Sequence, residues 1–474
     1  MGVNFSVLSN YYAALTQMSK PIITRKALRI STIEGSWASL HFLITSGVFF
    51  TGFALMLGAN DFQLGLLGAL PALAQVFQVL GAYLIERTGL RKGIVAWFSV
   101  VSRTMWLPIA LIPFFVHSRA VLIFMILYAV SSVVMNVAAP GWVTWMAAII
   151  PASIRGRYFG ARNRINGFVS IAGNLAAGFA IDLFRQHGHE AGGYLTLQLI
   201  AVVAGLTAFS LILRQPDPGA PAEPLPAIAH YLLQPLRDPN YRRILAFYLY
   251  WVFACGIASP FFNAHLLKHM QWNFKSIAGL GVIVAVIMMV VQTYWGRLID
   301  RYGHKPVLMV TVIGILHLPF YYAFCPWGSR WPIYVNTLLT GIFWAGFGLA
   351  SFNLVIDMLP SKSRTMYVAV LAALSGITSF AANVLSGWLA DAMDGVRWQI
   401  GSLTIVNYQI LFIMTGILRV PALLFLRRVH EPDAVTMRVL VRKMFAEFNQ
   451  RIGLNGPLFT GTMKDGGAEL PKQD

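Results

Sequence analysis

Uncharged stretches follow one another along this chain from residue 35 to residue 426. A helix that crosses the hydrocarbon layer of a membrane needs about 20 mainly apolar residues. Twelve stretches approach or exceed that length, two of them broken once, by Arg103 or Arg419: 35–60, 62–85, 93–118, 120–154, 165–181, 191–213, 244–267, 276–296, 306–329, 331–356, 365–390 and 398–426. The fifth is short unless its helix begins near Tyr158. Because polarity does not alternate as in barrel strands, the pattern predicts an all-α membrane protein with twelve transmembrane helices.

The composition also indicates a membrane protein. Of 474 residues, 57% are hydrophobic and 11% are charged, whereas soluble domains carry about a quarter charged residues. The net charge of +18, in a chain this apolar, favours a membrane protein over a nucleic-acid binder. Cys255 and Cys325 both lie in apolar runs, so we expect neither a disulfide framework nor a metal cluster.

The basic residues of the loops predict the orientation. If both termini lie on one side, that side holds 28 of the 36 Lys and Arg residues, and the opposite side holds six. Loops rich in Lys and Arg stay in the cytoplasm. We therefore expect cytoplasmic termini in a plasma membrane or a bacterial inner membrane.

A Pro-rich segment separates two sets of six helices. We therefore predict a cytoplasmic N-terminal segment (1–30), a first six-helix bundle (31–213), a cytoplasmic linker (214–243), a second six-helix bundle (244–428) and a cytoplasmic tail (429–474).

The tail contains one amphipathic segment. Its apolar side chains share one helical face, and the other faces are basic; the apolar residues are Met437, Val441, Met444 and Phe448. Such a helix suits an anionic membrane surface or, equally, the cytoplasmic face of the protein itself.

The two halves repeat each other. At an offset of 209 residues, eight positions between Pro151 and Asp182 match eight positions between Pro360 and Asp391. At an offset of 214, positions between Gln78 and Gly89 match positions from Gln292 onward. Because each half has an even number of helices, the halves are related by an axis along the membrane normal.

Two loops carry a shared motif: AYLIERTGLRK at 82–92 and GRLIDRYGHKP at 296–306. They resemble the G-x-L-a-D-r-x-G-r-k loop of the major facilitator superfamily, which joins helices two and three and again eight and nine. PASIRGRY at 151–158 and PSKSRTMY at 360–367 are similar to the family's loops after helices four and ten. The resemblance covers about 31–428 and implies the major facilitator fold, with two pseudo-symmetric six-helix bundles. The departures from the motif are Ala82, Glu86, His304 and Pro306.

The resemblance also implies a cytoplasmic gate. In the family, charged pairs at these loops are regarded as a latch of the outward-facing state. The matching residues here are Glu86, Arg87, Arg91, Arg155, Asp300, Arg301, Lys305 and Arg364. The alternative interpretation is ordinary anchoring of basic loops in the cytoplasm.

A third implication concerns the place where a solute binds. In this fold, helices one, four, seven and ten line the central cavity. Aromatic walls with a few hydrogen-bonding groups suit an organic solute, and the candidate substrate-binding residues are His41, Asn136, Trp142, Trp145, Trp251, Asn263, His265, Trp344 and Asn353. Taken alone, each of them is also explained by packing or by an interfacial aromatic belt.

Five ionisable residues within the spans are candidates for coupling or buried charge: Glu34, Arg103, His317, Asp357 and Arg419. Such residues are costly in a membrane and suggest function. Glu34 and Asp357 lie at cytoplasmic helix ends, where we expect water to reach them. The other three lie on helices that are peripheral in the family, where they either brace neighbouring helices or contact substrate.

These observations predict a secondary transporter that moves a small organic solute by alternating access. The sequence has no ATP phosphate loop, zinc-protease signature or nucleophile elbow, so it indicates neither an enzyme nor a cofactor. Proton coupling through Glu34, Asp357 or a histidine is one option, and a uniporter or exchanger is another. The excess of buried basic groups favours an anionic or polar substrate. The alternatives are a non-transporting receptor or assembly factor and a lipid-moving protein. We expect membrane lipids around a monomer and no nucleic-acid partner.

Overall fold

The computed structural model describes most of the chain. The described residues are 5–116, 118–150, 152–217, 235–326, 328–358, 364–401, 403–432 and 434–452. Within these ranges only the backbone is described for residues 5–24, 86, 147–148, 152–157, 356–357, 364–366, 445 and 447–452. The side chains of the gate candidates Glu86, Arg155 and Arg364 and of the coupling candidate Asp357 therefore lie outside the described residues, as does the middle of the linker.

Twelve helical stretches of the described chain are long and apolar enough to cross a membrane. In chain order, they are spans one to twelve: Arg25–Met56, Asp61–Ile85, Arg91–Phe115, Ala120–Met146, Tyr158–Gln186, Glu190–Arg214, Pro239–Lys268, Phe274–Tyr302, His304–Ala323, Trp331–Val355, Tyr367–Ala392 and Asn407–Arg428. Each overlaps the corresponding uncharged run, so the expected all-α fold with twelve spans is confirmed. Span five begins at Tyr158, which makes its short run long enough to cross.

In the amino-terminal half, spans one to three each consist of two helices and spans four to six of one. The helices are α1 (Phe5–Ile44), α2 (Gly47–Met56), α3 (Asp61–Ala74), α4 (Phe77–Thr88), α5 (Arg91–Thr104), α6 (Trp106–Phe115), α7 (Ala120–Ile149), α8 (Ala152–Gln186) and α9 (Glu190–Arg214).

In the carboxy-terminal half, spans seven, nine and twelve are divided. The elements are η1 (Pro235–Arg237), α11 (Pro239–Gly256), α12 (Phe261–Lys268), α13 (Phe274–Tyr302), α14 (His304–Leu316), α15 (Leu318–Ala323), α16 (Trp331–Met358), α17 (Arg364–Ala392), β1 (Arg397–Ile400), β2 (Leu403–Val406), α18 (Asn407–Leu418), α19 (Ala422–Arg428) and α20 (Met437–Ile452). The strands form an antiparallel hairpin in which Arg397 pairs with Val406. Span twelve therefore begins at Asn407, later than the uncharged run at 398.

Prolines explain most of the helix breaks. Proline lacks an N–H group and clashes with the carbonyl four residues earlier. Two of the breaks shortly precede Pro108 and Pro319, and two others include Pro260 and Pro421. The break in span one has another cause, because Gly47 adopts φ +60°, a left-handed conformation that glycine tolerates best.

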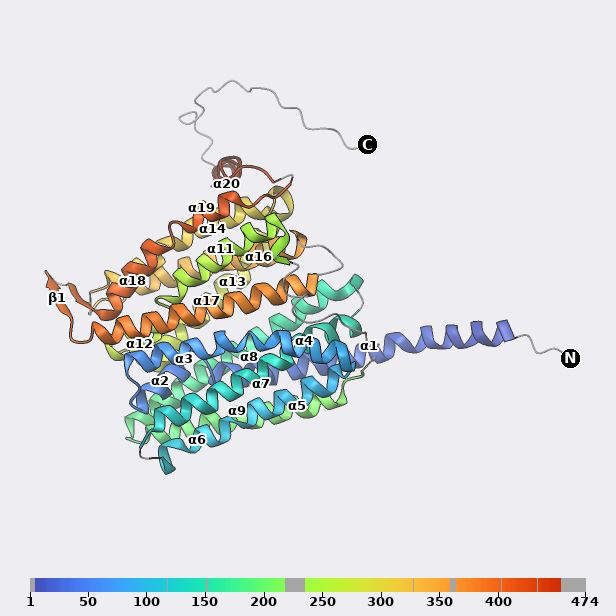
Figure 1. Ribbon diagram of the computed structural model, residues 1–474, viewed down its shortest axis with the longest axis horizontal. Coiled ribbons are helices and arrows are strands. Elements are labelled where there is room, and N and C mark those ends of the chain that lie inside the picture. Colours follow the sequence, from blue (N-terminus) through green and yellow to red (C-terminus); the bar gives the residue numbers. More distant parts are fainter. Residues whose placement is uncertain are drawn as a thin grey trace, which may run out of the picture.

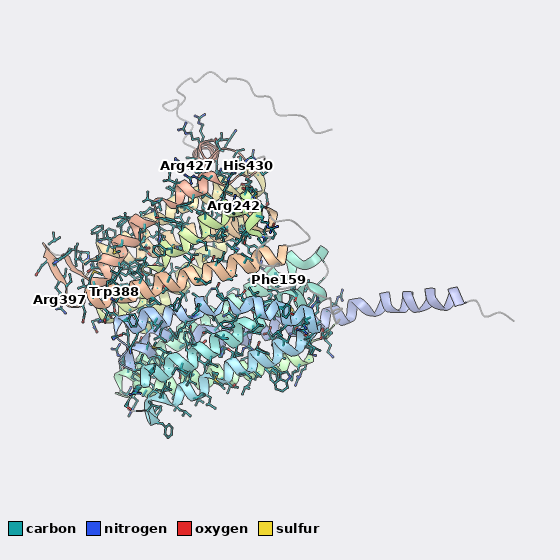
Figure 2. The ribbon with its side chains drawn as sticks, viewed as in Figure 1. Phe159, Arg242, Trp388, Arg397, Arg427 and His430 are labelled. Atoms are coloured by element: carbon teal, nitrogen blue, oxygen red, sulfur yellow. The ribbon has the colours of Figure 1, made fainter. Side chains whose placement is uncertain are left out.

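The two ends of the molecule differ. Each half has an even number of spans, so Arg25 and Arg428, at the two ends of the span series, lie on one face, which we call the terminal face. The β hairpin lies on the opposite face, the distal face (Figure 1). In Figure 2, Arg242, Arg427 and His430 are at the terminal end and Arg397 is at the distal end.

The hydrophobic core shows where the halves are joined. One cluster combines both halves, with Phe53 and Leu64 from the first and Phe261 and Tyr408 from the second. Two further clusters each belong to one half: one contains Trp145, and the other contains residues such as Trp251 and Leu440. The halves therefore share a core toward the distal face and have separate cores toward the terminal face.

Close backbone contact accompanies the shared core. Helix α17 lies along α3, α8 packs against α13, and α2 packs against α12 (Figure 1). A Cβ atom on Gly65 would lie 2.5 Å from the Cα atom of Gly387, which is too close for any side chain. At this point of the distal interface, α3 and α17 therefore meet backbone against backbone.

The tail packs on the second half. Leu440 of α20 is fully buried and Met444 packs against the same cluster. Before the helix, Glu431 accepts hydrogen bonds from the backbone N–H of His304 (2.9 Å), the ring Nδ1 of His304 (2.7 Å) and the backbone N–H of Lys305 (2.6 Å). Glu431 therefore caps the N-terminus of α14.

Candidate functional site

A cavity of about 860 Å³ lies between the two halves. Spans one to five contribute its wall on one side, and spans seven to ten contribute the other. Its polar lining includes Ser, Thr and Asn side chains from both halves, and its apolar lining includes Phe49, Trp106 and Met135. This volume lies in the range of about 300–1,000 Å³ that is usual for small-molecule sites.

Two arginines and a glutamate form the charged part of the cavity wall. Arg103 and Arg162 line the cavity, and Glu34 lies behind them with a side chain only 3% exposed. The carboxylate of Glu34 is 3.9 Å from the guanidinium of Arg103 and 3.5 Å from that of Arg162. The expectation that water reaches Glu34 is therefore not met, because its side chain is buried against these two arginines.

Further contacts hold the two guanidinium groups in place. Arg103 Nη1 donates to the carbonyl of Gly205 at 3.4 Å, and Arg162 Nε donates to the carbonyl of Ser31 at 3.3 Å. The guanidinium of Arg162 also lies over the ring of Trp142, 4.9 Å from its centroid, within cation–π range. The cluster thus links spans one, three, four, five and six.

Arg162 is not among the sequence candidates, because the loop count places it outside the membrane. The structure includes it in α8, where Arg162, Asn166, Ser170 and Asn174 all line the cavity. A spacing of four residues places side chains on one face of a helix. This polar stripe through an otherwise apolar span is the sequence signal that would have identified it.

Four of the sequence candidates line the cavity: His41, Asn136, Asn263 and Arg103. The ring Nδ1 of His41 lies 2.9 Å from the carbonyl of Ala201. A carbonyl only accepts, so Nδ1 carries a proton and donates to it. Asn136 is engaged by Gln78 and Ser132, whereas Asn263 has no described hydrogen bond.

The predicted tryptophan wall does not form part of the cavity lining. Trp142 supports Arg162, and Trp145 is fully buried and donates to the carbonyl of Pro216. Trp251 and Trp344 pack together in the core of the second half, with ring centroids 6.2 Å apart. Their helices are rotated so that the rings face neighbouring helices of the same half.

The other candidates also lie away from the cavity. His265 is fully buried beside Tyr408 and Phe412, and Asn353 does not line the cavity. His317 contacts the rings of Tyr321 and Phe343.

Arg419 braces two spans of the second half. Its Nη1 donates to the carbonyl of Ile315 at 3.3 Å. Pro319 cannot supply the N–H that this carbonyl would accept in a continuous helix. This contact fits the first of the two interpretations given for Arg419, that it braces neighbouring helices.

Two carboxylates join the halves at the distal face. Asp61 of α3 accepts from Lys268 Nζ (2.9 Å), Asn407 Nδ2 (2.7 Å) and the hydroxyl of Tyr408 (2.6 Å), all in the second half. Asp182 of α8 accepts from the backbone N–H groups of Phe274 and Lys275. We call Asp61 and its three partners the distal latch. The sequence does not reveal it, because these residues lie at the ends of three helices that are far apart in the chain.

The predicted gate residues at the terminal face differ from the distal latch in their contacts. Asp300 is exposed, and no described ion pair joins it to the first half. Lys305 Nζ donates to the carbonyls of Arg427 and Val429 within its own half, just as Lys92 Nζ donates to those of Leu213 and Gln215. Arg87 is exposed beside Tyr83, and Arg301 lies over the ring of Tyr302. Arg91 lies at the start of α5, with its Nε buried and without a hydrogen-bond partner.

Comparison with known proteins places the chain among membrane transporters. The family model described as Major Facilitator Superfamily matches residues 36–335 and 244–460. The tetracycline resistance protein, class H, of Pasteurella multocida is 26% identical over 153 residues, which is 32% of this chain and 35% of that protein. Synaptic vesicle 2-related protein of Bos taurus is 29% identical over 136 residues, 27% of this chain and 23% of that protein. The match thus spans about a third of the first relative and less of the second.

Solved structures share the fold. The xylose transporter XylE from E. coli, in an inward-open conformation, superimposes with a TM-score of 0.62 at 17% identity, covering 89% of this chain and 99% of that chain. The nucleoside transporter NupG superimposes with a TM-score of 0.60 at 13% identity, covering 85% of this chain and 98% of that chain.

Proposed function

Because the chain belongs to the major facilitator superfamily, we propose that this transporter carries a small organic solute across the membrane by alternating access. The observation that carries the proposal is the cavity of about 860 Å³, lined from both halves. It lies where the halves share a core on the distal side and have separate cores on the terminal side. A site reached from one face at a time is what alternating access requires.

The proposal assigns the terminal face to the cytoplasm. The support is the distribution of Lys and Arg, 28 against six, since positive loops stay in the cytoplasm. In this orientation the structure represents an inward-facing state, closed on the outside by the distal latch. The membrane is then a plasma membrane or a bacterial inner membrane.

The moving parts in this proposal are the bundles 31–213 and 244–428. Opening to the outside requires the bundles to separate at the distal face, and Asp61 then loses its three partners from the second bundle. Proton coupling through Glu34 belongs to the same proposal, because Glu34 is the described carboxylate that lies beside the cavity.

Reconstitution tests the proposal against many solutes at once. Proteoliposomes holding the full chain are incubated with a soluble metabolite extract, washed, and assayed by mass spectrometry for retained compounds. We expect at least one metabolite to be retained above protein-free liposomes, with or without a pH gradient. If none is retained under either condition, the transporter proposal fails, and a receptor or assembly role replaces it.

Crosslinking supplies the matched control. Cysteines at positions 61 and 268, in a background of Cys255→Ser and Cys325→Ser, are joined by a short bifunctional thiol reagent. The crosslink should abolish retention because it holds the halves together at the distal face. A second pair at Arg185 and Glu190, which form an ion pair of 3.8 Å within the first half, should leave retention unchanged.

A further inference from the structure

The charges around the cavity are unbalanced. Among the described residues that line it, the fully charged side chains are Arg103 and Arg162. Glu34 supplies one negative charge to both of them, so the cluster carries a net charge of +1 when all three are ionised. Uncompensated charge within a membrane span is costly, and an anion in the cavity would remove that cost.

The two arginines also have hydrogen-bond donors to spare. A guanidinium has five N–H donors, and one hydrogen bond is described for each of these two, to Gly205 and to Ser31. The distances to Glu34, 3.9 and 3.5 Å, exceed the roughly 2.7–2.9 Å of a charge-assisted hydrogen bond. Oε2 of Glu34 is buried and lies 3.5 Å from the guanidinium of Arg162, with no closer hydrogen bond described. Glu34 therefore neutralises the arginines incompletely.

The rest of the wall determines the size and polarity of what fits. A cavity of about 860 Å³ is far larger than an inorganic ion. The amides of Asn174 and Asn263 reach it without a described hydrogen bond of their own, and Trp106 and Met135 add apolar surface. An organic molecule with one acidic group and a few hydrogen-bonding groups satisfies all of these features.

Taking the transport role proposed above as its premise, we propose that the cavity binds a small organic anion, whose acidic group lies between Arg103 and Arg162. Glu34 is then an internal competitor, which occupies the guanidinium groups when the solute is absent. Carboxylate, sulfonate and phosphate monoester groups share the required chemistry, because each presents paired oxygens to the forked donors of arginine.

The first test compares anions with their neutral counterparts. The full chain is placed in nanodiscs of phosphatidylcholine, and the midpoint of thermal unfolding is measured with gluconate against glucitol, benzoate against benzamide, and glycerol phosphate against glycerol. At least one anion should raise the midpoint with increasing concentration, and its neutral partner should not. If only neutral compounds stabilise the protein, or no anion does, the proposal is overturned. Stabilisation by added phosphatidylglycerol alone would also overturn it, in favour of a lipid headgroup.

The second test assigns the effect to residues. Arg162→Gln should weaken the apparent affinity for the stabilising anion more than tenfold, and Arg162→Lys should weaken it less, because the charge remains but the fork is lost. Glu34→Gln should strengthen binding at least threefold by removing the competitor. Arg185→Gln, on the same helix but exposed and distant, is the control. Equal binding by Arg162→Gln and Arg185→Gln, or weaker binding by Glu34→Gln, contradicts the proposal.

Folding of the variants is controlled separately. Arg103→Gln is made together with Glu34→Gln, so that no buried carboxylate loses a partner, and the unfolding midpoint without ligand reports whether each variant is folded. The metabolite-retention experiment separates the two proposals. If a neutral solute is retained and Arg162→Gln does not change its retention, the proposal of an organic anion is wrong but the proposal of a transporter stands. If no compound is retained, the proposal of a transporter is itself wrong.

Discussion

Asp61 is a residue on which closure of the distal face directly depends. Its side chain is 4% exposed and accepts from three side chains of the opposite half. Asp61→Asn removes the charge that Lys268 pairs with and replaces one acceptor oxygen by a donor. Losing such contacts weakens the closed face by about 1–3 kcal/mol. The expected result is an outward shift, measured as faster labelling of Asn263→Cys by a membrane-impermeant thiol reagent added from the distal side.

The control for this variant is Glu190→Gln. Glu190 also lies at the distal end, but it pairs with Arg185 of its own half, so labelling of residue 263 should not change. Equal labelling rates for Asp61→Asn and the parent would show that the latch does not hold the halves together.

Individual residues also show why sequence alone locates the site only in part. The candidates His41, Asn136, Asn263 and Arg103 line the cavity, whereas the four tryptophans face other helices. In a membrane, lipid is as apolar as a protein core, so hydropathy does not reveal which face of a span points inward. That information resides in contacts between spans, such as Trp142 beneath Arg162.

At the scale of elements, the break in span one rests on Gly47. Its φ of +60° would strain any other residue by about 1–2 kcal/mol, and no atom lies within 4 Å of an added Cβ. Gly47→Ala should therefore lower the midpoint of thermal unfolding through backbone strain alone. Gly93→Ala is the matched control, because Gly93 is helical and its Cβ position is equally open. A midpoint for Gly47→Ala at or above that of Gly93→Ala would contradict this account.

We predict that docking of the tail, which lies outside the membrane-spanning segments, depends on pH. Burial raises the pKa of Glu431, but the hydrogen bonds from the His304 side chain and from the backbone of His304 and Lys305 outweigh it and hold the pKa below 4.5. A carboxyl group whose pKa is depressed by folding stabilises the folded state above its ordinary pKa, and this stabilisation disappears as the pH falls through the depressed value. Tail docking should therefore persist at neutral pH and weaken below about pH 4.5.

Fluorescence anisotropy of a dye on Arg442→Cys measures this docking. Anisotropy should drop on acidification, and Glu431→Gln should lower it already at neutral pH, by removing a carboxylate whose bonds contribute about 1.5–3 kcal/mol. Arg438→Gln changes a charge on the exposed face of α20 and should have no such effect. If Glu431→Gln leaves the anisotropy unchanged, the cap does not position the tail.

Elements are the level at which sequence is most informative. Twelve spans follow from hydropathy because length and apolarity are properties of each segment alone. The break in span two depends on local backbone geometry, and the start of span twelve at Asn407 depends on the pairing of the β hairpin. Those features require neighbours, which a hydropathy pattern does not contain.

For the whole molecule, the two faces should respond in opposite directions. The sequence motif places Glu86 and Asp300 at the terminal face. We propose that they keep this face closed in the outward-facing state. Glu86→Gln combined with Asp300→Asn should shift the population inward and slow distal labelling of Asn263→Cys, whereas Asp61→Asn accelerates it. The triple variant should lie between the two. If the double variant shows parental labelling and parental transport, Glu86 and Asp300 do not hold the terminal face closed.

Orientation is a property of the whole chain as well. Single cysteines at Arg330→Cys and Leu90→Cys replace exposed residues on opposite faces, in the background without Cys255 and Cys325. In intact cells, the impermeant reagent should label residue 330 and spare residue 90 until the membrane is opened by detergent. The reverse result would invert the assignment of cytoplasm and exterior.

The contact of Gly65 with Gly387 has a consequence for the cell's ion gradients. A chain of water molecules needs a continuous space large enough for each molecule, and at this point two backbones meet where not even a methyl group fits. Together with the apolar core that the halves share on this side, this contact should deny protons a path, so we expect the inward-facing protein to conduct no protons. Proton leak, rather than solute flux, is therefore the sensitive reporter of any side chain introduced at these two glycines.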